Sequence, residues 1–152
     1  MPNWCSNELT LRGNTEDIQN FHNKNLDENN ELDFNFEVPI PSDMQSDWYN
    51  WQVANWGTKW TAFDTIHKFH WKDNKEEHID YLLYCFNTAW SPPTEWLSTV
   101  STKYPNIDFC LKYGECGINF SGIYIIKNGL SLMKEGKYGE YYGEILDESD
   151  DN

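Results

Sequence analysis

The chain has 152 residues with 25 acidic and 11 basic side chains, so its formal charge at neutral pH is −14. Acidic residues outnumber basic ones throughout the chain, and such a surface repels phosphate groups and disfavours binding to nucleic acid. A mean hydropathy of −0.77 alone would suggest disorder, but 8 Trp, 9 Tyr and 8 Phe residues supply enough apolar area for a core. No apolar run approaches the length of a membrane span, and no signal peptide is expected. These observations predict one folded, acidic domain without membrane or direct nucleic-acid contacts.

The hydrophobic pattern predicts an alternation of strands and helices. Leu9 and Leu11 share one face of an alternating run, which indicates a half-buried strand, and Asn14 is placed to cap the helix that follows. Asn128-Gly129 is typical of the tight turn between two hairpin strands. In chain order the predicted elements are strand 6–13, helix 14–24, a polar loop over 23–37, helix 44–55 ended by Gly57, strands 62–72 and 78–87, helix 92–104, and strands 107–113, 118–127 and 130–133.

Two strand–helix–strand units around a central hairpin predict an α+β fold, a ferredoxin-like sandwich with the order βαββαβ. The sequence adds a helical insert, residues 27–60, before the second strand and an extra C-terminal hairpin strand. We expect residues 1–146 to form this single domain and residues 147–152 to be an acidic disordered tail.

The four cysteines are Cys5, Cys85, Cys110 and Cys116. They form no CxxC pair and no spaced framework, which favours free thiols in a reducing compartment such as the cytoplasm. Cys85 and Cys110 fall within apolar strand-like runs, so we expect them to be buried. His67 and His70 are three residues apart in a predicted strand and therefore point to opposite faces. We expect neither a metal site nor a bound cofactor.

Two loops are rich in Trp beside polar side chains, and they form the predicted binding site. Indole rings offer stacking faces, and neighbouring hydroxyl, amide and ammonium groups offer donors to a planar or nucleotide-like ligand. The alternative, left open for both loops, is that these Trp residues pin the loops to the sheet. For Trp4, Trp48 and Trp96 the structural role is favoured. The candidate residues are Asn55, Trp56, Lys59 and Trp60 in loop 55–60 and Thr88, Trp90 and Ser91 in loop 88–93.

The expected topology brings these two loops together. The second and third strands run antiparallel, so loop 55–60 before one and loop 88–93 after the other share one end of the sheet. We expect the first strand to run parallel to the third, which adds Gly13 to that end and places Trp4 at the opposite end.

Catalytic motifs do not stand out. The chain has no GxSxG element, P-loop or GxGxxG run, and no Cys has an obvious His partner. Lys59 and Asp64 are interpreted as a solvated ion pair rather than as an acid/base pair. An enzyme is therefore not favoured, although the sequence leaves the question open.

Three Trp-containing segments carry a family resemblance: Met1 to Asn7, Trp51 to Trp60 and Asn87 to Pro93. Together and in this order they resemble the YubB ferredoxin-like domain family, small proteins of bacteriophages and conjugative plasmids. The resemblance covers roughly residues 1–130. It implies the ferredoxin-like fold and an origin on a mobile element, and it implies no catalytic residues.

Two classes of function follow as hypotheses. The first is an accessory interaction protein of a phage or plasmid, an acidic inhibitor of a host defence system that occludes a basic, nucleic-acid-binding surface of a host protein in the cytoplasm. The second is a small-molecule or nucleotide binder, or a nucleotide-processing enzyme, that uses loops 55–60 and 88–93. A homodimer through the edge at 118–133 is a further hypothesis, because unpaired strand edges invite pairing.

We predict that the chain does not bind duplex DNA at physiological salt, because no segment supplies a clustered basic patch. Lys68, Lys72 and Lys75 are offset by the acidic residues at 73, 76 and 77. Fluorescence anisotropy with a labelled duplex tests this, and a micromolar, salt-sensitive complex would overturn it.

Overall fold

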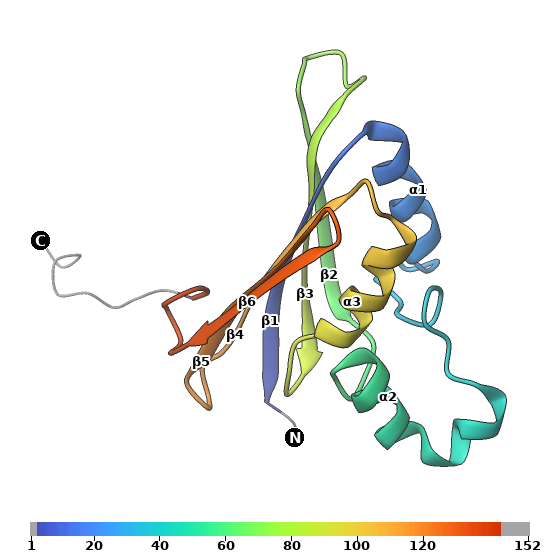
Figure 1. Ribbon diagram of the computed structural model, residues 1–152, viewed down its shortest axis with the longest axis vertical. Coiled ribbons are helices and arrows are strands. Elements are labelled where there is room, and N and C mark those ends of the chain that lie inside the picture. Colours follow the sequence, from blue (N-terminus) through green and yellow to red (C-terminus); the bar gives the residue numbers. More distant parts are fainter. Residues whose placement is uncertain (1–2, 144–152) are drawn as a thin grey trace, which may run out of the picture.

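The computed structural model describes residues 3–143, so the predicted tail at 147–152 lies outside the described residues. Six strands of this range form one antiparallel sheet in the order β2-β3-β1-β4-β5-β6, which confirms the predicted ferredoxin-like α+β fold (Figure 1). None of the helices in this range is both long and apolar enough to cross a membrane. The elements are β1 (Trp4–Arg12), α1 (Thr15–Asn25), the 3₁₀ helix η1 (Ser42–Asp47), α2 (Trp48–Trp56), β2 (Phe63–Trp71), β3 (Ile79–Ala89), α3 (Thr94–Lys103), β4 (Asp108–Glu115), β5 (Phe120–Lys127) and β6 (Leu130–Gly136).

The predicted direction of the first strand is wrong. β1 runs antiparallel to β3, with Trp4 opposite Ala89 and Leu11 opposite Leu82. The helical crossover makes β1 and β2 the parallel pair, and β3 inserts between them, antiparallel to both. Trp4 therefore lies at the same end of the sheet as the end of β3, and Gly13 lies at the opposite end.

The helices cover one face of the sheet and leave the other uncovered by any helix of residues 3–143 (Figure 1). Leu9 and Leu11 of β1 face the helices and are fully buried, as their alternation predicts. Cys85 and Cys110 are only half-buried, contrary to expectation, because their strand positions point to the open face. The helix-facing core includes Ile18, Phe21, Leu82, Tyr84, Trp96, Leu97, Val100, Phe109, Leu111 and Tyr113.

His67 and His70 point to opposite faces of β2, as predicted. The ring of His67 lies 4.5 Å from that of His22 in α1, and the ring of His70 stacks on Tyr81 at 4.0 Å. His22 also lies 2.7 Å from the hydroxyl of Tyr84. Burial, together with the neighbouring His67, lowers the pKa of His22 to about 4, so its imidazole is neutral at physiological pH.

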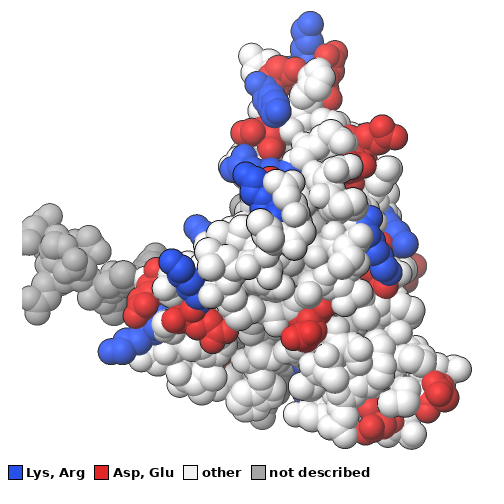
Figure 2. All heavy atoms as spheres, viewed as in Figure 1, with Lys and Arg blue, Asp and Glu red and all other residues white. Residues whose placement is uncertain are grey.

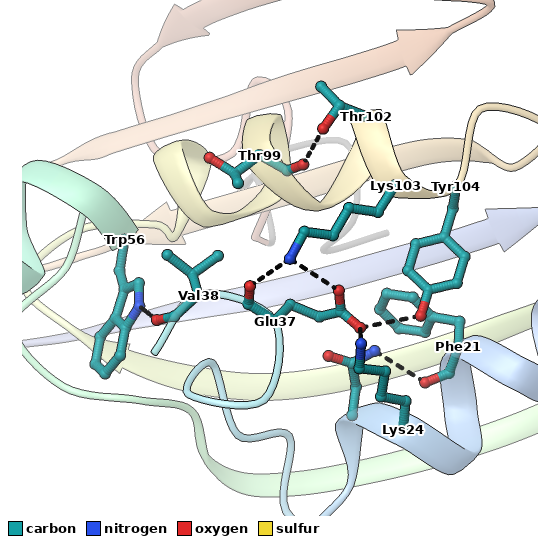
Figure 3. A network of polar contacts seen from close by, with 10 residues as sticks. Phe21, Lys24, Glu37, Val38, Trp56, Thr99, Thr102, Lys103 and Tyr104 are labelled. Atoms are coloured by element: carbon teal, nitrogen blue, oxygen red, sulfur yellow. Dashed lines mark hydrogen bonds and ion pairs between the residues drawn. The ribbon is translucent and has the colours of Figure 1, made fainter. Parts of the chain in front are cut away.

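The polar insert is anchored by a buried carboxylate. Glu37 is buried between α1 and α3, where its Oε1 lies 3.1 Å from the Lys24 ammonium and accepts a hydrogen bond from the Tyr104 hydroxyl at 3.0 Å (Figure 3). Lys103 donates to the backbone carbonyl of Glu37 at 2.6 Å and lies 3.4 Å from its Oε2. Burial alone would raise the pKa of Glu37, but the contacts with Lys24, Tyr104 and Lys103 outweigh it and hold that pKa below its usual value.

Two predicted turns are confirmed by their backbone geometry. Gly57 ends α2 with φ of 87°, and its N–H donates to the carbonyl of Val53. Asn128 and Gly129 have φ of 53° and 77°, the positive values that a two-residue hairpin turn requires. The residue types at both positions were therefore sufficient to predict the helix end and the hairpin turn.

We predict that Glu37→Gln lowers the free energy of unfolding at pH 7 by about 2 kcal/mol, because the buried side chain loses its charge-assisted contacts. A carboxylate with a depressed pKa stabilises the fold above its unfolded pKa, about 4.3, and this contribution is lost as pH falls through the lower folded value. Urea denaturation should therefore show the full difference from the unmodified chain at pH 7 and a smaller difference at pH 3.

The control is Glu28→Gln, an exposed acidic residue of the same insert, which should leave stability unchanged. A Glu37→Gln effect that is equally large at both pH values would show that the charge of the carboxylate does not anchor the insert.

Candidate functional site

The two Trp-rich loops meet at one end of the sheet, as the antiparallel pairing of β2 and β3 predicts. The Ser91 hydroxyl donates to the carbonyl of Gly57 at 2.5 Å, and the Thr58 hydroxyl donates to the carbonyl of Ala89 at 2.8 Å. These two hydrogen bonds join the end of α2 to the exit of β3. Gly57 also packs closely on α3, because a Cβ there would lie 3.1 Å from the Pro92 carbonyl oxygen.

The polar candidates at this end are used inside the protein. The buried Thr88 hydroxyl donates to the carbonyl of Ser91 at 2.7 Å and accepts from the Asn7 amide at 3.0 Å. The Asn55 amide donates to the carbonyl of Trp51 at 2.9 Å. The Ser91 hydroxyl is bonded as well, so the side chains of all three residues donate to backbone carbonyls within the protein.

Trp56 belongs to the core, which corrects its expected place on an exposed surface. Its side chain is 1% exposed, and its indole N–H donates to the carbonyl of Val38 at 2.9 Å (Figure 3). Its ring contacts Phe34 edge-on. Trp60 and Trp90 remain 39% and 45% exposed. The structural alternative therefore holds for Trp56, whereas the rings of Trp60 and Trp90 are accessible in part and stay candidates for binding.

Trp4 joins the same end and was missed by the sequence reasoning. Its side chain is 51% exposed and its ring meets Phe63 edge-on at 5.2 Å. The backbone N–H of Trp90 donates to the carbonyl of Asn3 at 2.8 Å, so the start of β1 and the exit of β3 are tied together. A prediction of β1 as antiparallel to β3 would have placed Trp4 at this end of the sheet.

Trp48, expected to be structural, is also partly exposed and lies edge-on to Tyr49, whereas Trp96 is fully buried as expected. Lys59 extends over the rings of Trp60 and Tyr49, with its Nζ 4.6 Å and 5.7 Å from their centroids. It thus makes cation–π contacts in place of the expected pairing with the Asp64 carboxylate.

Trp90 adopts a backbone conformation that is rare for a bulky residue. Its φ is 72°, and the N–H of Ser91 donates to the carbonyl of Ala89 at 2.9 Å, which closes a γ-turn. Such a conformation costs on the order of 1–3 kcal/mol and persists only where its surroundings hold it. Here the contacts of Thr58, Thr88 and Asn3 hold the turn, and the indole ring stays partly in solvent.

We refer to this group of side chains as the aromatic end. Its members are the exposed Trp4, Trp48, Tyr49, Trp60 and Trp90 and the half-buried Lys59 and Phe63. Figure 2 shows the lower part of the molecule, around α2, with few charged side chains and with acidic groups at its margin. Three surface hollows of about 210, 260 and 270 Å³ lie along β5–β6 and β2–β3, and none of the three includes a residue of the aromatic end.

Two further groups bear on the chemistry of the molecule. Cys5 is buried, which raises its thiol pKa to about 12 and makes it unreactive at neutral pH. Asp73, Glu77 and His78 bring ligand atoms within 4.8 Å of one another in the exposed turn before β3. All three side chains are exposed, and His78 Nδ1 lies 3.3 Å from the Asp73 carboxylate.

Residues 66–151, more than half of the chain, match the family model described as the ferredoxin-like domain in Api92-like protein. The chain belongs to this family. This match supports the ferredoxin-like fold, and it does not confirm the resemblance to the YubB family.

A solved structure with the same fold is the protein api92 from Yersinia pseudotuberculosis, with a TM-score of 0.54 and 16% sequence identity. The match covers 70% of this chain but only 39% of that one, so it supports the fold and leaves function open. No curated protein matches the chain.

We predict that substitution of Trp56 destabilises the fold much more than substitution of Trp60. Trp56→Ala should lower the free energy of unfolding by about 3–5 kcal/mol, since it empties a buried ring site. Trp60→Ala should change it by less than about 1 kcal/mol, since the ring is partly in solvent. Urea denaturation measures both, and an equal loss in the two variants would place Trp60 in the core.

Proposed function

We propose that this chain is an interaction protein that binds a basic surface of another protein through the aromatic end. The observation that carries the proposal is a division of roles between neighbouring side chains. The hydroxyls and amides of the two loops hold the loops together, while the rings of Trp4, Trp60 and Trp90 remain accessible. Accessible aromatic side chains on a fixed backbone are typical of protein interfaces.

The charge of the chain supports a basic partner. A net charge of −14 on a small domain attracts a basic surface over distance and speeds the encounter, and this effect weakens as salt screens it. The 3₁₀ helix η1, which directly precedes α2, carries Asp43 and Asp47. In the bound state the aromatic rings supply the apolar contact, and the acidic residues around them supply the steering.

The resemblance to the YubB family extends the proposal to a biological setting. The chain would be an accessory protein of a phage or plasmid that acts in the cytoplasm of the host cell. Its partner would be a host protein, such as a component of a defence system, whose basic nucleic-acid-binding surface the chain occludes. In this proposal the excess of acidic side chains stands in for the negative charge of the nucleic acid that the host surface binds.

The alternative, a small-molecule or nucleotide binder at the same loops, has less support. A ligand site needs convergent free donors, and Asn55, Thr88 and Ser91 already donate to backbone carbonyls. Lys59 would be the cationic donor, and its ammonium lies over two rings. Calorimetric titration with nucleotides tests this alternative directly.

We predict that the double variant Trp60→Ala/Trp90→Ala folds normally and loses binding to the partner. The immobilised chain would first capture partners from a bacterial lysate, and calorimetry with the purified partner would then give affinities. Each buried aromatic anchor contributes about 2 kcal/mol or more, so the loss should be at least roughly 30-fold for each ring. The affinity of the unmodified chain should fall as salt rises.

Leu130→Ala is the matched control, since it removes an exposed apolar side chain beside the β5–β6 turn, at the end of the sheet opposite the aromatic end. It should bind as the unmodified chain does. Full binding by the double variant, or a measurable nucleotide affinity that the double variant loses, would overturn the proposal.

A further inference from the structure

The outer strand β6 is exposed along its length and carries apolar side chains on both faces. It is the last strand in the sheet order, and β5 is its one strand partner among residues 3–143. Leu130 and Leu132 are 77% and 52% exposed on the open face, and the exposed Met133 lies on the opposite face. An exposed edge with apolar residues on both faces is a site where another strand adds.

The tight hairpin determines which backbone groups of β6 face outward. Lys127 and Leu130 flank the two-residue turn and form a hydrogen-bonded pair, and such pairs alternate along an antiparallel ladder. The N–H and C=O groups of Ser131, Met133 and Glu135 therefore point away from β5. They form a row of donors and acceptors that an antiparallel strand can satisfy.

We propose that β6 pairs with β6 of a second copy of this chain, antiparallel and centred on Met133. In this register Met133 faces its own counterpart, and Ser131 faces Glu135 of the second copy. All outward-facing groups of both strands are then paired. A shift of the pairing by two residues in either direction leaves some of these backbone groups without a partner. The centred register is therefore the one in which two copies of β6 satisfy all of them.

The charges along the edge fit a second copy. In the centred register Lys134 faces Leu132 and Glu135 faces Ser131, so no like charges lie directly opposite each other. Residues 127–137 contain Lys127, Lys134 and Lys137 against Glu135, a local charge of +2, whereas the whole chain carries −14. Two such edges carry like charge, so the row of backbone groups and the apolar side chains, rather than charge attraction, would hold the two copies together.

This pairing is independent of the aromatic end, which is built on β1, β2 and β3 and lies across the sheet from β6. Sedimentation equilibrium of the full chain from micromolar to millimolar concentration tests it. We expect a monomer–dimer equilibrium that tightens as salt rises, because salt screens the repulsion between two acidic chains. A monomer at every protein and salt concentration would overturn the proposal, and the edge would then be a candidate site for a strand of a different protein.

The register is tested with one substitution at two positions. Met133→Lys sets two ammonium groups face to face and should weaken dimerisation about tenfold or more. Ser131→Lys sets its ammonium opposite Glu135 of the second copy and should leave dimerisation intact or strengthen it. Equal weakening by both variants would overturn the proposed register.

A final experiment mixes two variants of Met133, each of which should dimerise poorly by itself. Met133→Glu alone should be as weak as Met133→Lys alone, because both oppose like charges. An equimolar mixture of the two should recover a dimer, since Lys then faces Glu across the centre. Thermal unfolding of both variants confirms that the exposed substitutions leave the fold intact, and a mixture that stays monomeric overturns the pairing.

Discussion

Two hydrogen bonds between side chain and backbone hold together the end of the sheet on which the proposed function rests. Ser91 donates to the Gly57 carbonyl and Thr58 donates to the Ala89 carbonyl, so each loop supplies a donor to the other. They fix the end of α2 against the exit of β3. Trp56 turns inward to the carbonyl of Val38, and Trp60 stays partly in solvent.

The same arrangement explains why polar residues beside Trp do not form a ligand pocket here. Thr88 and Ser91 donate to the backbone carbonyls of Ser91 and Gly57, and these bonds support the positive φ of Trp90. Rings held rigidly in solvent lose little conformational entropy on binding, which favours a protein interface. Glu37 plays the corresponding role for the insert, whose buried end it secures between α1 and α3.

Much of the fold could be predicted because it depends on local signals. Alternation at Leu9 and Leu11, the cap at Gly57 and the Asn128-Gly129 turn each specify local geometry without help from distant residues. The convergence of the two loops followed from the hairpin of β2 and β3. The direction of β1 follows from the helical crossover, which makes β1 parallel to β2 and antiparallel to β3, and the prediction assigned the parallel pairing to β3 instead.

Burial within the site could not be predicted from local signals. Trp56 and Trp60 have similar neighbours in sequence, and what separates them is Phe34, which reaches the core from a segment rich in Asn and Asp. Half-buried Cys85 and Cys110 show the same limit, because nothing in their strands reveals that the helices cover only one face. Long-range packing decides these cases.

Proton–nitrogen NMR of the Trp indole groups tests the division between structural and accessible side chains most directly, recorded for the free chain and with its captured partner. We expect the indole N–H of Trp56 to be protected from solvent exchange in both states. Those of Trp60 and Trp90 should exchange rapidly in the free chain and become protected on binding. Protection of Trp60 and Trp90 in the free chain, or rapid exchange that persists in the complex, would contradict the account.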